Sequence, residues 1–334
     1  MEIKEAIKRV IERKDLTAIE MREVMNEIIK GEATSTQKGG FLTGLKAKGE
    51  TSEELLGAVQ ALRDNMVKID IKDNNNLIDT CGTGGDGSKT FNISSAVAII
   101  AASGGAKVAK HGNRAVSSKS GSLDVLNELG IKTDHSKEES EKLIEEKGMS
   151  FLLAPSYNSG MKNVAKERLE LGTRTIFNML GPLLNPAPLT GQLMGVYDES
   201  LLETVGQVLL DLGLERAMVV HGNDGLDEIT TTTTTQVCEV KDGALIKYVF
   251  NPEDFGIKLV DIKEIEGGAP EFNANIILDI LKGEKGAKRD IVVLNSGAAL
   301  YVAKIVDSIE DGIKMAEDLI DSGKAFAKYS ELKA

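Results

Sequence analysis

The first part of the chain carries apolar residues at helical spacing. Thr17–Glu20 and Thr51–Glu54 have the spacing of capping boxes, which indicates the starts of two helices. The apolar stripe of the first helix is expected to comprise Ile19, Val24, Met25 and Ile28. Another helix is predicted over residues 35–48, and the polar segment Ile71–Asn76 is predicted to be a hinge or linker.

From Leu77 onward, short apolar strands alternate with helices. Strands are expected at 77–79, 107–110, 151–154, 193–196 and 217–220, and helices at 93–102, 122–129, 199–212, after Ser136 and from Asp307. Residues 237–240 and 244–250 are predicted to form a hairpin around Lys241-Asp242-Gly243. This order favours an α/β fold with a small all-helical domain. Its mixed, mostly parallel sheet would carry ligand loops at the carboxyl ends of the strands.

Length and composition narrow the class of protein. With 334 residues the chain exceeds the usual size of one domain, so two structural units are expected. The longest apolar run, Ala96–Ala102, is too short to cross a membrane, and the N-terminus lacks the apolar core of a secretory signal. Cys81 and Cys238 are the only cysteines, so no disulfide framework is expected. We therefore expect a cytoplasmic enzyme with no membrane partner.

The charge distribution indicates an anion site within an acidic protein. The formal net charge of −12 argues against a nucleic-acid binder, which needs a broad basic face. From Ser88 to Leu123, however, the chain has no Asp or Glu. The same stretch contains Lys89, Lys107, Lys110, Arg114 and Lys119. The alternative interpretation is a core segment rich in Gly, Ala and Ser that needs no acids.

A glycine-rich loop is the first of three segments suited to a phosphorylated ligand. Gly82–Gly87 follows a strand and has four glycines in six residues, which permits positive φ and a nest of N–H groups before the next helix. Asn92, Ser94 and Ser95 would add donors at that helix start, and the Ser94 hydroxyl is a candidate Mg²⁺ ligand. The loop matches neither a Walker A motif nor GxGxxG, so ATP and NAD are poorly supported. A tight structural turn is the alternative.

Two further segments supply cations and carboxylates. The second segment combines the basic and hydroxyl groups of Lys110–Arg114 and Ser117–Ser122, which suits a diphosphate. His111 within it is a weak candidate for acid–base catalysis, because the adjacent cations oppose its protonation. His221–Glu228 places three acids after a strand, where Mg²⁺ or a solvated acidic loop would explain them. Together the segments predict a sugar or nucleotide diphosphate held through Mg²⁺. Transfer at an anomeric carbon would rest on positioning and charge stabilisation, with no residue assigned as catalytic acid or base.

Four motifs in this order resemble the anthranilate phosphoribosyltransferases. They are DTCGTGGDGSKTFNIS (79–94), KVAKHGNRAVSSKSGSLDVLNELG (107–130), RLELGTRTIFNMLGPLLNPA (168–187) and VVHGNDGLDEIT (219–230). The resemblance implies transfer of the 5-phosphoribosyl group from phosphoribosyl pyrophosphate (PRPP) to the amino group of anthranilate, a step of tryptophan biosynthesis. It also implies the class II nucleoside phosphorylase fold. Residues 1–70, with about 167–188, would form a helical, homodimer-forming domain, and residues 71–166 and 189–334 an α/β domain.

The resemblance also assigns residues to ligands. Asn113 and Arg168 would face anthranilate, since a guanidinium suits its carboxylate. Mg²⁺, expected as two ions, would be held by Ser94, Asp227 and Glu228. The PRPP site would comprise Gly82, Gly85, Asp86, Thr90, Asn92, Ile93, Ser94, Ser95, Lys110, His111, Gly112, Asn113, Arg114, Ala115, Val116, Ser117, Ser118 and Ser122.

The chain departs from the family in two places. Ser156, Asn158, Ser159 and Gly160 stand where many members carry two His and a Pro-Ala, and Thr233-Thr234 replaces a Gly-Pro. The first departure predicts a roomier, less specific acceptor channel, or else a covering loop whose residues drift freely.

Two other functions would use the same fold. A pyrimidine nucleoside phosphorylase would carry a glycine loop resembling KHSTGGVGD, and its assay would be thymidine phosphorolysis without PRPP. A nucleic-acid-binding paralogue would have a basic surface and a degraded acidic motif. The loop DTCGTGGDG, the acidic net charge and the intact Asp227-Glu228 pair disfavour both.

Overall fold

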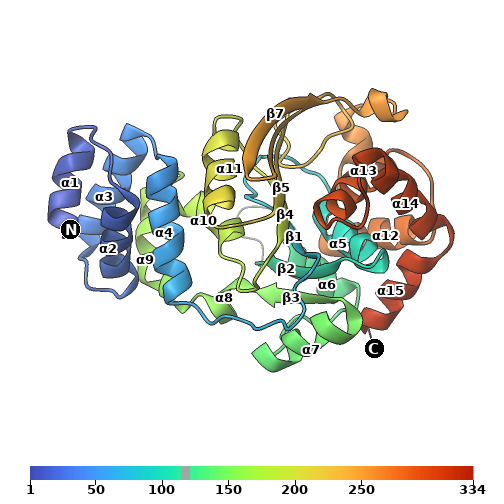
Figure 1. Cartoon of the computed structure of the whole chain (residues 1–334), viewed down its shortest axis with the longest axis horizontal. Coiled ribbons are helices and arrows are strands. Elements are labelled where there is room, and N and C mark those ends of the chain that lie inside the picture. The colour runs from blue at the N-terminus through green and yellow to red at the C-terminus, as the bar shows by residue number, and fades with distance from the viewer. Residues whose placement is uncertain (114–120, 334) are drawn as a thin grey trace.

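A helical bundle lies beside a sheet-containing part of the molecule (Figure 1). The computed structural model describes residues 1–113 and 121–333. The first four helices are α1 (Ile3–Ile11), α2 (Ala18–Ile29), α3 (Ser35–Lys48) and α4 (Ser52–Asp64). Thr17 and Thr51 cap α2 and α4 as their sequence spacing predicts, and Thr34 caps α3 in the same way. In each box the threonine oxygen accepts from a backbone N–H that the helix leaves unpaired, which stabilises the helix start.

Later segments lead from the third strand back to the bundle, and the last two of them join its core. They are α8 (Ala154–Tyr157), the 3₁₀ turn η1 (Ser159–Met161), α9 (Lys162–Leu171) and α10 (Phe177–Leu183). Val164 on α9 and Phe177 and Leu180 on α10 share one apolar core with α1–α4. Residues 65–76 connect α4 to the first strand, along the lower edge of the view in Figure 1.

The predicted stripe of α2 is wrong at one position. Ile19 is 73% exposed, whereas Met21, Val24, Met25 and Ile28 are buried. The reason is helical geometry. At 100° per residue, Ile19 lies about 200° from Met21 and so faces the opposite side of the helix.

The described residues form a sheet of seven strands in the order β3-β2-β1-β4-β5-β6-β7. The strands are β1 (Leu77–Gly82), β2 (Lys107–Gly112), β3 (Met149–Leu153), β4 (Gly191–Gly195), β5 (Arg216–Gly222), β6 (Thr235–Lys241) and β7 (Ala244–Phe250). The first five in this order are parallel, and β6 and β7 are antiparallel, as the sequence pattern predicts. Asp242 and Gly243 both have positive φ at the hairpin turn, which an Asp-Gly pair favours.

Alternate residues of the central strands face two different layers. Leu193 and Met218 pack into a core shared with α5 (Ile93–Ser103) and α13 (Ala287–Val302). Met194 and Val219 face α11 (Leu201–Asp211) and the bundle core. The remaining helices are α6 (Ser122–Glu128), α7 (Lys137–Lys147), α12 (Pro270–Leu281), α14 (Ile309–Asp321) and α15 (Lys324–Lys333), with 3₁₀ turns η2 (Pro252–Phe255) and η3 (Ile262–Ile265). The parallel strands therefore end in loops that lie between two covered faces.

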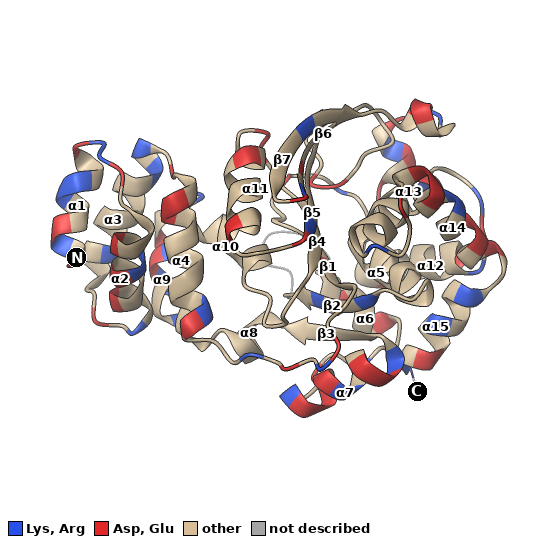
Figure 2. Ribbon diagram, viewed as in Figure 1, with Lys and Arg blue, Asp and Glu red and all other residues tan. Residues whose placement is uncertain are grey.

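Charged residues lie mainly on the outer helices. In Figure 2, Lys and Arg alternate with Asp and Glu on α1 and α2, whereas the sheet is mostly tan. Among the described residues, no helix combines the length and the apolar character needed to span a bilayer.

Candidate active site

The glycine loop, Gly82–Gly87, leaves the carboxyl end of β1 in a conformation that its glycines make possible. Gly84, Gly85 and Gly87 have φ of +63°, +74° and +75°, values that side chains with a Cβ rarely adopt. The Thr83 N–H donates to the carbonyl of Gly195 at the end of β4, at 3.0 Å. The loop is thus anchored to the neighbouring strand while several of its backbone groups stay exposed, as a phosphate-binding nest requires.

The acidic loop, Asn223–Glu228, follows β5 and packs directly on the ends of β1 and β4. The Gly84 N–H donates to Oδ2 of Asp227 at 2.7 Å. A Cβ at Gly82 would overlap the Asp227 carboxylate, and a Cβ at Gly195 would overlap the Asp227 backbone. Glycine at both strand ends is therefore what brings this carboxylate into the glycine loop.

Asp227 and Glu228 form a closely spaced acidic pair. Burial, followed by the charge of Asp86, raises the pKa of Asp227 well above its ordinary value. Burial, followed by the charge of Asp227, likewise raises the pKa of Glu228, and Lys110 opposes that rise. Like charges held this close are unfavourable unless a proton or a cation compensates them. The pair is therefore suited to an ion with two positive charges.

The same residues meet the requirements of Mg²⁺. Its preferred ligands are carboxylate and hydroxyl oxygens, and it usually combines one or two carboxylates with substrate phosphates. In the described part of the chain, no three His, Cys, Asp or Glu side chains form a group that could hold a metal alone. Asp227 and Glu228 would then supply the protein carboxylates, and a bound diphosphate would supply further oxygens.

The start of α5 lies against Glu228. The backbone N–H of Ser94 donates to the Glu228 carboxylate, which favours its ionised form. Ser94 is partly exposed, whereas the side chains of Ile93 and Ser95 are buried, so those two can offer only backbone groups to a ligand. Asn92 precedes the helix and its Oδ1 accepts from Asn273 at 3.1 Å. Thr90 Oγ1 lies 3.2 Å from Ser88 Oγ, farther along the loop.

Lys110 lies beneath the site rather than in the open. It is 3% exposed, and its Nζ donates to the carbonyl of Thr80 and, at 3.2 Å, to Ser94 Oγ. Its charge opposes the burial-driven rise in pKa of Asp79, a carboxylate with no exposed surface. Asp79 also accepts from the Asn185 side chain at 2.8 Å. The positive charge of Lys110 thus compensates the carboxylates of Asp79 and Glu228 from below the site. The sequence did not reveal this role.

His111 is unsuited to proton transfer. Burial, with a smaller contribution from Lys110, lowers the pKa of His111 to about 4. The imidazole therefore stays neutral near pH 7, in agreement with the weak acid–base candidacy that its flanking cations predict.

The end of the second ligand segment is partly described. Ser122 Oγ donates to the Asn113 carbonyl at 3.3 Å, and a Cβ at Gly112 would lie 2.8 Å from that hydroxyl. Gly112, Asn113 and Ser122 therefore lie together at the carboxyl end of β2. The predicted site residues Arg114, Ala115, Val116, Ser117 and Ser118 lie outside the described residues.

Arg168 lies on α9, and its guanidinium lies near an aromatic ring. Its Cζ is 5.5 Å from the centre of the Phe177 ring, and burial lowers its pKa. Within the described residues it makes no ion pair with a carboxylate. The neighbouring Glu167 is buried and pairs with Lys38 on α3 at 3.0 Å, which holds α9 to the bundle. A half-buried guanidinium that pairs with none of the carboxylates in residues 1–113 and 121–333 is suited to an anionic ligand.

The departures near the acceptor segment have different surroundings. Ser156 is exposed, whereas Asn158 is 6% exposed and its Nδ2 donates to the Leu184 carbonyl at 3.3 Å. Asn158 therefore joins the α8 segment to the end of α10. The roomier acceptor channel stays a prediction.

The third acid of the acidic loop, Asp224, binds the threonine run that follows the loop. The Asp224 carboxylate accepts from the hydroxyls of Thr230, at 2.6 Å, and Thr232. The backbone N–H of Asn223 donates to the Thr234 carbonyl at 2.9 Å. Asp224 is thus used to close this loop through the threonine hydroxyls, and Thr234 closes it through its backbone carbonyl.

Arg174, which sequence reasoning missed, reaches the glycine loop from the bundle side. Its Nη2 donates to the Gly85 carbonyl, and its Cζ lies 4.0 Å from the centre of the Tyr197 ring. Arg174 falls within the motif RLELGTRT, so the sequence marked the segment but not this contact.

Comparisons with known proteins give the same relationship over both parts of the chain. Residues 4–66 match the glycosyl transferase family, helical bundle domain, and residues 74–326 match its a/b domain. The anthranilate phosphoribosyltransferase of Clostridium beijerinckii is 66% identical over 100% of this chain and 98% of its own length. That of a Thermoanaerobacter species is 58% identical over 99% and 97%.

Solved structures agree with these relatives. The anthranilate phosphoribosyltransferase of Thermus thermophilus has a TM-score of 0.92 and 37% identity, covering 98% of each chain. The Saccharomyces cerevisiae enzyme in complex with PRPP and Mg has a TM-score of 0.89 and 26% identity, covering 99% of this chain and 96% of its own. On these matches, the chain belongs to the anthranilate phosphoribosyltransferase family.

Proposed function

We infer that this chain transfers the 5-phosphoribosyl group of PRPP to the amino nitrogen of anthranilate, giving N-(5-phosphoribosyl)anthranilate and pyrophosphate. The observation that carries the inference is the Asp227–Glu228 pair packed into an exposed glycine loop. This arrangement suits a metal-bound diphosphate far better than a neutral sugar.

The reaction needs positioning and charge stabilisation more than proton transfer. The anthranilate nitrogen forms a bond to the anomeric carbon while the bond from that carbon to the pyrophosphate oxygen breaks. The bonding electrons leave with pyrophosphate, and the proton lost from nitrogen passes to solvent or to the departing pyrophosphate. Mg²⁺, which we propose binds as two ions, would neutralise the developing negative charge.

Different residues of this chain would bind the metal and phosphates, the anthranilate, and the ribose. Asp227, Glu228 and Ser94 would hold the metal, and N–H groups of the glycine loop and of the α5 start would hold the phosphates. Arg168 and Asn113 would hold the carboxylate and amine of anthranilate at the right distance from the ribose. The remaining predicted PRPP residues would surround the ribose and diphosphate, except Lys110, whose buried ammonium would support the site from below.

The direct test is the loss of anthranilate fluorescence with PRPP and Mg²⁺. We expect turnover that requires all three components and produces pyrophosphate in equal amount. Thymidine with inorganic phosphate, in the absence of PRPP, forms the second arm. Phosphorolysis of thymidine without any consumption of anthranilate would contradict the proposed function.

Replacing Arg168 by Ala is expected to weaken the binding of anthranilate more than the binding of PRPP. Loss of a charge-assisted partner for the carboxylate costs about 2 kcal/mol, which corresponds to about a thirtyfold rise in the KM for anthranilate. The KM for PRPP should change much less. Steady-state kinetics with each substrate varied in turn measures both values, and an equal rise for the two would assign Arg168 a structural role.

We also propose that the helical domain, residues 1–70 with about 167–188, forms a homodimer, and that the enzyme works in the cytoplasm. Ile19 and Leu169 are 73% and 83% exposed on bundle helices, which suits burial against a second copy. The free thiols of Cys81 and Cys238 fit a reducing compartment. Light scattering coupled to gel filtration should give twice the mass of the 35.8 kDa chain, and a single-chain mass would refute the dimer.

A further inference from the structure

The glycine loop is held from two sides by groups that come from different parts of the chain. On one side, Asp227 of the acidic loop accepts from the Gly84 N–H at 2.7 Å. On the other side, Arg174 donates to the Gly85 carbonyl. Arg174 belongs to the short segment between α9 and α10, three residues before α10 begins at Phe177. The loop is therefore clamped between the sheet and the helical bundle.

Tyr197 closes this clamp into a ring of contacts. The Arg174 guanidinium lies 4.0 Å from the centre of the Tyr197 ring, a favourable position for a cation over an aromatic face. The backbone N–H of Tyr197 donates to Thr83 Oγ1 at 3.1 Å. Thr83 is in the glycine loop, so the loop, Tyr197 and Arg174 support one another. A planar guanidinium is well suited to lie on the ring and donate to the carbonyl at the same time.

The contact with Gly85 determines the direction of a backbone donor. The Gly85 carbonyl and the Asp86 N–H belong to one planar trans peptide and point in opposite directions. With the carbonyl bound to Arg174, the Asp86 N–H must face away from the bundle. Gly84 and Gly85 both have positive φ, and glycine rotates more freely than any other residue when it is not held. Arg174 thus removes freedom from the most flexible part of the loop.

Arg174 also connects the two proposed substrate sites. It is six residues from Arg168, and the chain between them is the end of α9 and a short turn. Movement of α9 and α10 would therefore be transmitted to the glycine loop through one side chain. This argument rests on the proposed function, in which Arg168 binds the acceptor and the glycine loop binds the donor.

We propose that Arg174 is a positioning residue that holds the glycine loop in its diphosphate-binding shape and links the donor loop to the acceptor segment. It acts through Gly85 and does not itself bind the substrates.

The test combines PRPP binding with the mobility of the loop. Calorimetry with PRPP and Mg²⁺, without anthranilate, should give about tenfold weaker binding for Arg174→Ala, the effect of losing one charge-assisted hydrogen bond. Arg174→Lys should recover part of this loss because an ammonium can still donate to Gly85. Tyr197→Leu should give a smaller loss. Hydrogen exchange of the peptide covering residues 83–88 should be faster in Arg174→Ala than in the wild type.

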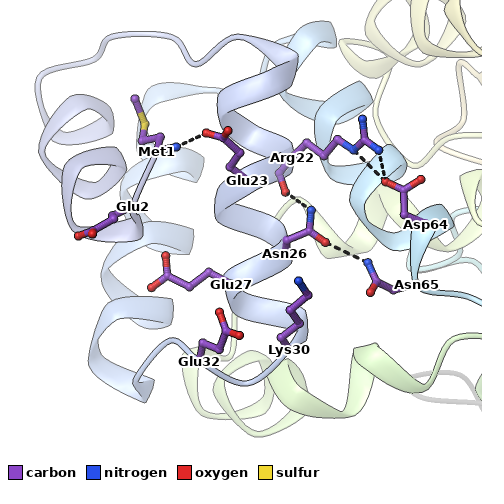
Figure 3. Close-up of a pocket in the computed structure, with 10 residues that line it drawn as sticks. All are labelled: Met1, Glu2, Arg22, Glu23, Asn26, Glu27, Lys30, Glu32, Asp64 and Asn65. Atoms are coloured by element: carbon purple, nitrogen blue, oxygen red, sulfur yellow. Dashed lines mark hydrogen bonds and ion pairs between the residues drawn. The ribbon is translucent and has the colours of Figure 1, made fainter.

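The matched control is Arg22→Ala. Arg22 is another exposed arginine, which donates through Nε to Asp64 at 2.8 Å and lines a surface hollow of the bundle (Figure 3). None of the residues that line this hollow belongs to the glycine loop. Its loss should leave both PRPP binding and exchange in residues 83–88 unchanged.

The outcomes separate this proposal from the proposed function. Wild-type exchange at residues 83–88 in Arg174→Ala would overturn the positioning role, whatever the substrate. Faster exchange that Arg174→Lys reverses would support it. A wild-type chain that does not bind PRPP would refute the proposed function alone, since the exchange measurement involves no ligand. Equal loss of binding in Arg22→Ala and Arg174→Ala would also overturn the proposal.

Discussion

The double variant Asp227→Asn/Glu228→Gln should lose nearly all metal-dependent turnover, with kcat/KM for PRPP lower by about a thousandfold. The amides keep the size of the side chains but remove both charges that a divalent cation needs. Folding should persist, because the unfavourable repulsion between the two carboxylates disappears as well. Steady-state kinetics over a range of Mg²⁺ concentrations, with circular dichroism to verify folding, measures this result.

The control for this variant comes from the same loop. Asp224→Asn removes the third acid, which binds the hydroxyls of Thr230 and Thr232 instead of facing the glycine loop. It should lower stability but retain the normal Mg²⁺ dependence. Normal turnover of the double variant in excess Mg²⁺ would show that the metal is held elsewhere.

The pH dependence of metal binding provides a second readout of the same pair. Burial and neighbouring carboxylates raise the pKa of Asp227 to about 7 and that of Glu228 to about 8, so Mg²⁺ must displace protons at neutral pH. Wild-type affinity for Mg²⁺ should therefore rise as pH increases through these values. When EDTA removes the metal, the stability of the folded protein should depend on pH in the opposite direction. The free energy of unfolding should fall as the pH rises from the ordinary pKa values of 3.8 and 4.5 up to these raised values, because over that range the folded state holds protons that the unfolded state has lost.

Lys110→Met should cause the largest loss of stability among the site variants. Lys110 is buried and compensates Asp79 from below, so its removal leaves an uncompensated buried carboxylate. Lys110 and Asp79 interact through their charges without a direct ion pair, so we expect a loss of up to about 3 kcal/mol in the free energy of unfolding, the low end of the cost of leaving a buried charge uncompensated. Urea titration followed by circular dichroism measures the difference.

The same substitution three residues earlier on β2 is the control. Lys107 pairs with the exposed Asp73 at 2.8 Å, and loss of such a surface pair costs about 0–1 kcal/mol. Adding Asp79→Asn to Lys110→Met should return part of the lost stability, because the buried charge is then removed as well. Equal losses for Lys107→Met and Lys110→Met would mean that Lys110 compensates no buried charge.

Local order is where sequence reasoning was most successful. The capping boxes at Thr17 and Thr51, the seven strands and the Asp242-Gly243 turn were all predicted and are all present. Each depends on residues within a few positions of one another, through a hydrogen bond, a repeat of apolar positions or a backbone angle. The sequence likewise predicted that the glycine and acidic motifs follow strands and carry residues suited to phosphate and Mg²⁺.

Local patterns in the sequence were enough to predict the N-terminal helices, the succession of strands along the chain and the three segments with phosphate and metal chemistry. How these segments meet depends on contacts between distant parts of the chain. Gly84 and Asp227 are 143 positions apart, and Arg174 and Gly85 are 89 apart, so no local pattern reports either contact. Lys110 was expected to face the diphosphate, yet its ammonium is bound by Thr80 and Ser94 below the site. A long side chain at a strand end can lie on either side of it. Its position depends on the space that distant glycines leave and on the buried charges that need an opposite charge nearby. Both depend on how the whole chain packs, so the local sequence does not report them.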